Sequence, residues 1–197
     1  MADSHGHIVH LGERDCSIQR RNQKVIEECP SPIMTPSLRK KMGNAAVKLA
    51  KSVGYENAGT SEFLVDQDRH FYFMEMNTRI QVEHTITEEV YGCDLVKEQI
   101  RIAAGQPLSP HVARAIPRLH AIQCRLNAED PANHLQPTPA RIDFHYSPVG
   151  RCARMHPHPY PGYTGPPHCD SLIAKHVTVC PTPHNGLIPL STALGDR

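Results

Sequence analysis

Two short segments of the chain carry carboxylate side chains at a spacing that would bring them together. Glu62 lies in the run T-S-E-F-L-V-D, and Glu75 lies in the run F-Y-F-M-E-M-N. Both runs are rich in apolar and aromatic residues and flank the polar stretch 67–70, a pattern that predicts an antiparallel hairpin. If Asp66 pairs with Phe71 in this hairpin, then Glu62 pairs with Glu75 and the two carboxylates converge.

Strand alternation places Glu62, Glu75 and Asn77 on one face of the predicted hairpin. The opposite face then carries Phe63, Val65, Tyr72 and Met74. Like charges that lie opposite each other on a sheet are destabilising, so the two glutamates indicate a bound cation. Carboxylate and amide oxygens suit Mg²⁺, which combines few protein oxygens with phosphate oxygens, and they form a poor zinc site. The alternative is that both glutamates lie on the solvated face of an ordinary hairpin.

A polar segment follows the predicted metal ligands directly. From Glu75 to His84 the chain reads E-M-N-T-R-I-Q-V-E-H, which adds Arg79, Gln81 and Glu83. A charged residue taken singly is more often part of a surface ion pair than of a site. The position of these groups, just after two converging carboxylates, favours a functional role.

Two amphipathic helices are predicted on either side of the hairpin in sequence. Thr35 and Pro36 form a typical N-cap and first-turn pair, and apolar residues then recur at helical spacing until Gly54. These apolar residues are Leu38, Met42, Ala45, Ala46, Leu49 and Val53. The second helix begins near Asp94 and ends at Gly105. Its predicted apolar face is formed by Val96, Ile100 and Ala103.

Composition restricts the class of protein. The chain has 39% hydrophobic and 21% charged residues, and its net charge of +1 comes from 21 basic and 20 acidic side chains. These values fit a globular protein without an electrostatic footprint for nucleic acid or an anionic membrane. No apolar run approaches the ~20 residues that span a bilayer, and no secretory signal is recognised, so we expect a cytoplasmic location. The seven cysteines form no C-x-x-C pair and are predicted to be reduced thiols.

The proline distribution predicts a domain boundary. Fifteen of the eighteen prolines follow Gln106, which favours a boundary between Pro107 and Pro117. An α+β first part would precede it, with an antiparallel sheet covered by helices. A smaller mixed domain should begin with a strand at 121–126. No structure is predicted beyond Gly150, and prolines and a glycine give poor helix propensity after Lys175. Clustered His156, His158, His168 and Cys169 match no common zinc spacing.

The E-M-N-T-R-I-Q-V-E-H run, preceded by G-T-S-E-F, resembles the signature of biotin carboxylases within the ATP-grasp superfamily. The resemblance extends upstream through H-L-G-E-R-D-C-S-I-Q-R-R-N-Q-K at 10–24 and downstream through D-L-V-K-E-Q-I-R-I-A-A-G-Q-P-L at 94–108. It continues as H-A-I-Q-C-R-L-N-A-E-D-P at 120–131 and fades after D-S-L-I-A-K at 170–175. About nine-tenths of the chain is covered.

The resemblance implies a fold and a reaction. Residues 1–108 would form the C-terminal half of an ATP-grasp domain, and 117–197 would form the biotin carboxylase C-terminal domain, degenerate after about residue 150. In the implied reaction ATP phosphorylates bicarbonate, carboxyphosphate collapses to carbon dioxide and phosphate, and biotin on a carrier protein captures the carbon dioxide. The implied cofactors and substrates are therefore ATP, Mg²⁺ or Mn²⁺, and biotin.

The resemblance also implies residue roles. Glu62 and Glu75 would bridge the metal to ATP, and Asn77 would complete the metal shell. The residues implied to bind bicarbonate are Lys24, Arg79, Gln81, Val82 through its backbone, and Glu83. Glu83 would also be the general base, and Arg125 would stabilise the enolate-like oxygen of biotin. The ATP site would include Asn22, although many relatives carry histidine at that position. Thr85 stands where relatives usually have proline.

Several alternatives are compatible with the sequence. The family's N-terminal domain and glycine-rich lid do not precede Met1, so the isolated chain is expected to be inactive. A non-catalytic fragment or pseudoenzyme is therefore one alternative to a functional carboxylase component. The first assignment of the parent enzyme is a bacterial acetyl-CoA carboxylase, and carboxylases of pyruvate, propionyl-CoA, methylcrotonyl-CoA or urea are the others. The implied partners are a biotin carboxyl carrier protein, a carboxyltransferase and a second copy in a homodimer, with no nucleic acid and no membrane.

Overall fold

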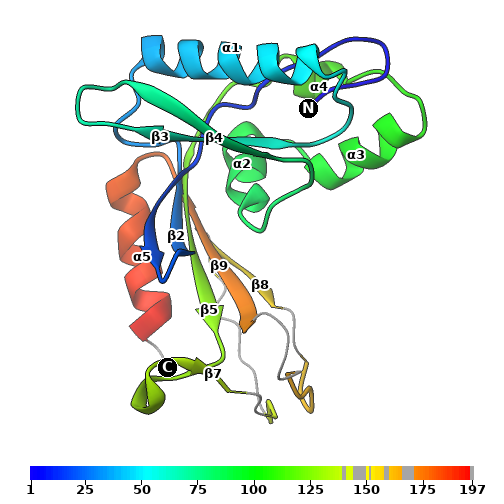
Figure 1. Ribbon diagram of the computed structural model, residues 1–197. Coiled ribbons are helices and arrows are strands. Elements are labelled where there is room, and N and C mark those ends of the chain that lie inside the picture. The colour runs from blue at the N-terminus through cyan, green and yellow to red at the C-terminus, as the bar shows by residue number, and fades with distance from the viewer. Residues whose placement is uncertain (139–140, 144–149, 151, 158–159, 166–170, 196–197) are drawn as a thin grey trace. The chain divides into compact units, whose positions relative to one another are not determined.

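The computed structural model describes residues 1–138, 141–143, 150, 152–157, 160–165 and 171–195, which are coloured in Figure 1. The chain divides into two compact units. The first unit contains Met1–Asp15 and Cys29–Leu119, and the second contains Cys16–Glu28 and His120–Arg197. No helix within the described ranges is long and apolar enough to cross a membrane.

The first unit contains the predicted hairpin, formed by β3 (Thr60–Val65) and β4 (Phe71–Asn77) as an antiparallel pair. Glu62 lies opposite Glu75, as predicted. The predicted pairing of Asp66 with Phe71 is wrong, because Phe71 lies opposite Val65. A β-bulge between Glu62 and Phe63 shifts the register by one residue and brings the two glutamates back into line.

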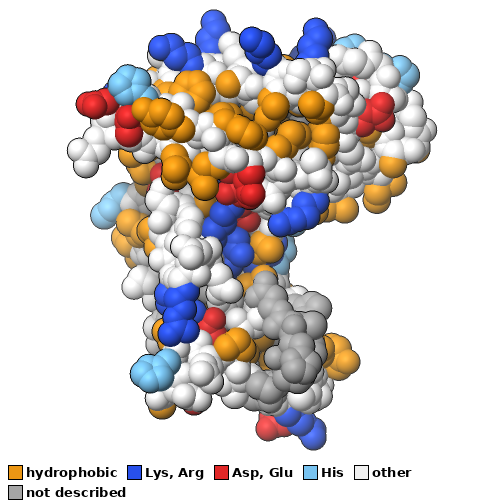
Figure 2. Space-filling model, viewed as in Figure 1, with side chains coloured by type: hydrophobic (Ala, Val, Ile, Leu, Met, Phe, Trp, Pro, Cys, Tyr) orange, Lys and Arg blue, Asp and Glu red, His pale blue; other side chains and the backbone are white. Residues whose placement is uncertain are grey.

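The bulge also changes which side chains share a face. Phe63 packs edge-on against Phe71 and Phe73, with ring centroids 5.6 and 5.9 Å apart. The prediction that Phe63 shares its face with Tyr72 and Met74 is therefore wrong, because the extra residue in β4 reverses the alternation beyond it. Apolar side chains are visible over this hairpin in Figure 2, and more than half of the surface of Leu64, Tyr72, Phe73 and Met74 is exposed.

Helix α1 (Pro36–Ser52) begins where the sequence predicts. The Thr35 hydroxyl accepts a hydrogen bond from the backbone N–H of Leu38 at 3.2 Å, which confirms the N-cap. Leu38 is buried, whereas Val53 follows the helix and is 64% exposed, so the predicted apolar stripe ends one turn earlier. Figure 1 shows α1 running alongside the β3–β4 hairpin.

Three further helices complete the first unit: α2 (His84–Tyr91), α3 (Leu95–Ala103) and α4 (Pro110–Ala113). Helix α2 is not predicted. Thr85 lies in its first turn, where a proline is tolerated, so the departure from the family pattern leaves the helix intact. Helix α3 begins at the predicted cap, and the Asp94 carboxylate accepts from the backbone N–H of Lys97.

The predicted apolar face of α3 is wrong. Val96 is 46% exposed and Ile100 is 66% exposed. The residues that α3 buries are Leu95, Glu98 and Ile102. Glu98 takes a buried position because its carboxylate accepts a hydrogen bond of 2.6 Å from the backbone N–H of Ser109, which begins the next helix. The hydrogen bond from Ser109, a residue outside α3, therefore helps to determine which face of the helix is buried.

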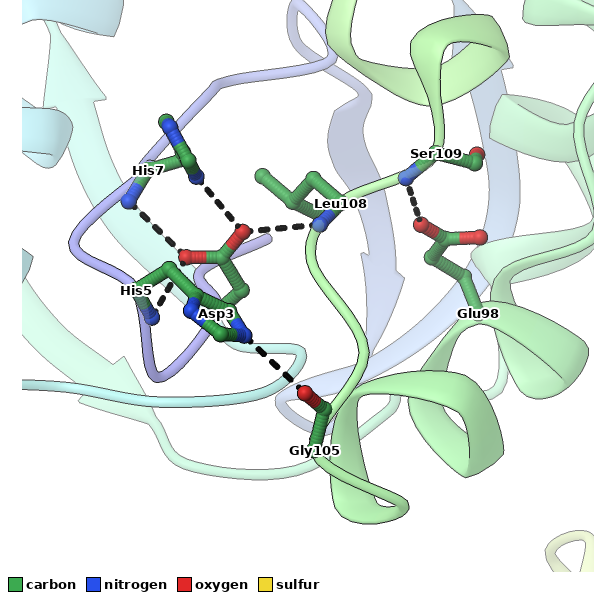
Figure 3. Close-up of polar contacts among 7 residues, drawn as sticks. All are labelled: Asp3, His5, His7, Glu98, Gly105, Leu108 and Ser109. Carbon is green, nitrogen blue, oxygen red and sulfur yellow. Dashed lines mark hydrogen bonds and ion pairs between the residues drawn. The ribbon is translucent and has the colours of Figure 1, made fainter.

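Asp3 joins the start of the chain to the connection between α3 and α4 (Figure 3). Its carboxylate accepts from the backbone N–H groups of His5 and His7, both at 2.9 Å, and from that of Leu108 at 2.7 Å. The His7 ring lies 2.9 Å from the same carboxylate, and the His5 ring lies 2.9 Å from the carbonyl oxygen of Gly105. Asp3 is only 3% exposed, so these contacts form a buried polar tie within the first unit.

The second unit is built on a five-stranded sheet with the order β1–β2–β5–β9–β8. Its strands are β1 (Asp15–Arg20), β2 (Gln23–Cys29), β5 (His120–Asn127), β8 (Ala153–Pro157) and β9 (Leu172–Cys180). The predicted strand at 121–126 is confirmed as β5. Arg21 and Asn22 join β1 to β2 with φ values of 50° and 64°, the left-handed pair that a two-residue hairpin turn requires. Short strands β6 (Glu129–Asp130) and β7 (Gln136–Pro137) flank the 3₁₀ turn Pro131–Asn133.

Helix α5 (Pro183–Gly195) packs on β5 and β9, although the sequence predicts no structure there. The buried core of this unit is formed by Ile122, Cys124, Leu126, Ala174 and Leu190. Pro189 lies inside α5 and lacks the N–H that would bond to Asn185, and the Cys180 thiol donates to the Asn185 carbonyl oxygen instead, at 3.2 Å. Tertiary packing therefore outweighs poor helix propensity.

Candidate functional site

The structure brings Glu62, Glu75 and Asn77 together at the end of the β3–β4 hairpin. The Asn77 side-chain amide donates hydrogen bonds to Glu62 at 3.1 Å and to Glu75 at 3.0 Å. Glu62 and Asn77 are half-buried, and Glu75 is exposed. An N–H donor therefore lies between two carboxylates that face each other across the strands, which relieves part of their repulsion.

These three side chains fit a magnesium ion. Two carboxylates and one amide oxygen are hard oxygen donors, and Mg²⁺ accepts few protein ligands because it keeps water and phosphate oxygens. The Asn77 amide would present its oxygen after rotation of the amide group. Within the described ranges, no group of three or more His, Cys, Asp or Glu side chains is arranged to hold a metal ion. A set of two carboxylates and one amide would leave the remaining positions around such an ion to water or phosphate oxygens.

Gln81 links the carboxylate pair to the interior of the first unit. Its side-chain N–H donates to Glu62 at 2.8 Å, and its carbonyl oxygen accepts from Arg14 at 3.0 Å. Arg14 also donates to the hydroxyls of Thr60 at 3.0 Å and Thr87 at 2.9 Å. Because a guanidinium only donates, Arg14 fixes the orientation of the Gln81 amide and turns its N–H toward Glu62.

The other predicted residues of the first unit lie between β4 and α2. Arg79 is exposed, and its guanidinium donates to the Asn77 oxygen at 3.4 Å and to the Ile80 carbonyl oxygen at 3.2 Å. Val82 is half-buried. Glu83 is only 2% exposed and is the N-cap residue of α2, where the helix dipole favours a carboxylate. A single short segment thus carries an exposed cation, a half-buried valine and a buried carboxylate.

The second unit holds the predicted residue Arg125 on β5. Its Nε donates to Glu27 Oε1 at 2.6 Å, and Gln123 donates to Glu27 Oε2 at 3.0 Å. The Arg125 side chain is 15% exposed and that of Glu27 is fully buried. Lys175 on β9 lies directly opposite Arg125. Glu27 therefore forms an ion pair with one of two cationic residues that lie opposite each other on the neighbouring strands β5 and β9.

The two remaining predicted residues lie in the first hairpin of the second unit. Asn22 is exposed in the β1–β2 turn, and Lys24 is half-buried near the start of β2. Neither Arg14 nor Glu27 is among the predicted site residues. Arg14 lies in the E-R-D-C-S run at 13–17, but only its hydrogen bond to Gln81 places it beside the site. His158, His168 and Cys169, considered as zinc ligands, lie outside the described residues.

Comparison with known proteins gives two family matches. Residues 1–111 match the carbamoyl-phosphate synthase L chain, ATP binding domain, and residues 123–196 match the biotin carboxylase C-terminal domain. Biotin carboxylase 1 of Bacillus subtilis is 49% identical over 197 residues, which are 100% of this chain and 44% of that protein. A pyruvate carboxylase subunit of Methanothermobacter thermautotrophicus is 55% identical over 175 residues, which are 89% of this chain and 35% of that protein.

A solved structure resembles the whole chain. The biotin carboxylase domain dimer of the Hydrogenobacter thermophilus 2-oxoglutarate carboxylase, in complex with MgADP, ADP and bicarbonate, superposes with a TM-score of 0.93 and 45% identity. The match covers 99% of this chain and 43% of that one. The chain therefore spans less than half the length of these relatives.

Proposed function

The chain belongs to the biotin carboxylases, and we propose that its polar groups serve the ATP-dependent carboxylation of biotin by bicarbonate. The observation that carries this proposal is the Asn77 amide held between Glu62 and Glu75. This pair of facing carboxylates stands immediately before the segment with Arg79 and Glu83. A cation site next to an anion-binding segment is what the joining of ATP and bicarbonate requires.

We propose that Glu62, Glu75 and Asn77 hold Mg²⁺, or Mn²⁺, together with the phosphates of ATP. When bound, the ion neutralises charge on the nucleotide phosphates. The residues themselves supply oxygen donors at the edge of a hairpin whose other face is packed with aromatic rings. Arg14 supports this arrangement through Gln81, because the Gln81 N–H holds Glu62 in place.

Bicarbonate binding is proposed for the segment after β4. The planar guanidinium of Arg79 suits a bidentate contact with a flat oxyanion, and Gln81, the Val82 backbone and Lys24 would add further contacts. Glu83 is the proposed general base that removes the bicarbonate proton. Its nearly complete burial supports this role, because a buried carboxylate is shielded from bulk water and held in one orientation.

Arg125 and Asn22 are proposed to contact the other two substrates. The Arg125 guanidinium would stabilise negative charge on the ureido oxygen of biotin as the ureido nitrogen loses its proton. Its ion pair with Glu27 supports a fixed orientation for this task. Asn22 is proposed to lie near ATP. Its left-handed backbone suits asparagine and is also tolerated by histidine, the residue of many relatives.

The acceptor of the parent enzyme and its partners are further proposals. We propose a biotin carboxyl carrier protein and a carboxyltransferase as partners, a homodimer as the assembly, and acetyl-CoA carboxylase as the first assignment. The pyruvate carboxylase relative keeps other acceptors open. We also propose domains at 1–108 and 117–197, which the two family matches support. A cytoplasmic location is proposed as well.

The test uses a chimera in which these 197 residues replace the matching stretch of the Bacillus subtilis relative. We expect ATP hydrolysis that depends on bicarbonate and is stimulated by free biotin. Glu83→Gln should lower this rate by ~100-fold or more, because a missing general base typically costs 10²–10⁴-fold. The matched control is Glu56→Gln, an exposed glutamate of the same unit, and it should keep the parental rate.

Two other outcomes would contradict the proposal in different ways. A folded chimera without turnover would favour the non-catalytic fragment or pseudoenzyme. An active chimera in which Glu83→Gln keeps its rate would exclude Glu83 as the base and leave the carboxylation itself supported.

A further inference from the structure

We infer that Glu27 is a positioning residue, which orients the Arg125 guanidinium toward biotin. This inference rests on the proposed role of Arg125 and adds a residue to it. Glu27 lies on β2 and contacts two residues of the neighbouring strand β5. It is an internal acidic group with a defined task, and the sequence motifs do not point to it.

The contacts divide the Glu27 carboxylate between two donors. Oε1 accepts from the Nε of Arg125 at 2.6 Å, and Oε2 accepts from the side-chain amide of Gln123 at 3.0 Å. Arg125 and Gln123 are two residues apart on β5, so their side chains project from the same face of the strand. One carboxylate thereby spans both donors and is fixed in rotation as well as in position.

Burial restricts the orientation of the Glu27–Arg125 ion pair. Glu27 and Gln123 are both fully buried, and the Arg125 side chain keeps 15% of its surface exposed. The guanidinium is therefore anchored at its Nε, in a side chain that is not completely buried. A contact to Nε sets the plane of the whole guanidinium group, because that group is rigid and planar.

The charged neighbours of Arg125 also support a positioning role for Glu27. Lys175 faces Arg125 across β5 and β9, and two cations at opposed positions repel each other. The Glu27 carboxylate lies on the other side of Arg125, since β2 and β9 flank β5. Its contact with Nε places a negative charge on the side of Arg125 away from β9. A cation held in a fixed orientation suits the oxygen that becomes negative when biotin is deprotonated.

A purely structural role for Glu27 would be to tie β2 to β5. The two roles predict different kinetics. A structural tie supports all activities of the site equally, whereas a positioning residue affects the step that uses Arg125 more than the steps that do not. The comparison between biotin-dependent and biotin-independent ATP hydrolysis separates them, since both rates are measured on one protein.

The experiment uses Glu27→Gln in the chimera defined above. This substitution keeps the shape of the side chain and removes its charge. We expect the kcat/KM for biotin to fall ~10-fold or more beyond any change in the bicarbonate-dependent rate without biotin, because misplacement of a group by about 1 Å can cost that much. The control is Glu28→Gln, the neighbouring half-buried glutamate on β2, which should show no such difference.

The double variant Glu27→Gln with Arg125→Gln tests whether the effect passes through Arg125. We expect it to be no slower with biotin than Arg125→Gln alone. If both rates of Glu27→Gln fall together, or if neither falls while Arg125→Gln is impaired, the positioning role is wrong and the proposed function of Arg125 stands. If Arg125→Gln itself keeps its biotin-dependent rate, both proposals fail.

A second variant covers the case in which Glu27→Gln does not fold. Gln123→Leu removes only the neutral partner of the carboxylate and leaves the Arg125 ion pair. It should show the same selective loss with biotin, to a smaller degree. Equal loss of both rates in Gln123→Leu would overturn the inference.

Discussion

Arg14 makes three hydrogen bonds that a lysine could not reproduce, since they leave from two nitrogens of a planar group toward three different elements. We expect Arg14→Lys to release the Gln81 amide and, through it, Glu62. The affinity of the chain for Mn²⁺ should fall ~10-fold, as is typical when a group behind a metal ligand is lost. Isothermal titration of the 197-residue chain with Mn²⁺ measures this change.

The control for this prediction is Arg69→Lys in the exposed turn between β3 and β4. Like the test variant, it leaves the net charge unchanged, and it touches none of the proposed ligands. Equal Mn²⁺ affinity in Arg14→Lys and the parent chain would show that Gln81 and Glu62 hold their positions without Arg14.

Strand alternation is enough to find Glu62, Glu75 and Asn77, since these residues belong to one local hairpin. Arg14 and Glu27 cannot be found in this way. The acceptors of Arg14 are 46, 67 and 73 residues away along the chain, and Glu27 and Arg125 are 98 residues apart. No periodicity in the sequence encodes contacts of that separation.

At the scale of secondary structure, the N-caps Thr35 and Asp94 are predicted correctly because a cap needs only neighbouring residues. The β3–β4 bulge is not, and it leaves the tip of the hairpin one residue out of the predicted register. Helix α3 is predicted at the right place but with the wrong buried face. Its apolar residues predict one buried face, but the helix buries another, on which Glu98 accepts a hydrogen bond from the Ser109 backbone. No local sequence pattern reveals this contact.

Pro189 carries a prediction about α5. It lies inside the helix and cannot donate a backbone hydrogen bond to Asn185. We expect Pro189→Ala to restore that donor and to raise the free energy of unfolding of the chain by ~1 kcal/mol or more, because proline in a helix interior costs up to ~3 kcal/mol. Urea denaturation followed by circular dichroism measures the change.

Pro181→Ala, at a proline that precedes α5, is the matched control and should change stability much less. A decrease in stability for Pro189→Ala would mean that the Cys180 thiol bond to Asn185 and the present packing are better than a regular helix at this position.

At the scale of the whole molecule, we expect acid stability to depend on the buried contacts of Asp3. Burial alone raises the pKa of Asp3, but hydrogen bonds from the Leu108 and His7 backbones, the His7 ring and the His5 backbone outweigh it and lower the pKa to about 2. A carboxyl with a lowered pKa in the folded state stabilises the fold above its ordinary pKa, and this contribution disappears as the pH falls from about 4 to about 2.

We therefore expect Asp3→Asn to lower the free energy of unfolding at pH 7 by on the order of 1–2 kcal/mol. The difference from the parent chain should shrink as the pH falls below about 4. Urea denaturation at a series of pH values measures it, with the exposed Asp68→Asn as control. A difference that stays constant down to about pH 2 would assign the loss to shape and not to charge.

The division into two units is the part of the architecture that the sequence predicts least well. A change in proline content places one boundary near Pro107–Pro117. The chain also leaves the first unit at Cys16 and returns to it at Cys29. The β1–β2 hairpin has an ordinary composition, and only its pairing with β5 assigns it to the second unit. For this reason Asn22 and Lys24 are part of the same unit as Arg125, whereas Arg79 is part of the first unit.

The placement of residues 16–28 in the second unit has a consequence for the synthesis of the protein. During translation β2 leaves the ribosome well before its neighbour β5, which begins at His120, roughly ninety residues later. For that interval the nascent chain carries a strand edge without its partner and an acidic side chain destined for the interior. We expect the charge of Glu27 to disfavour pairing of that edge with another chain until β5 is available, because charged side chains on strand edges hinder association.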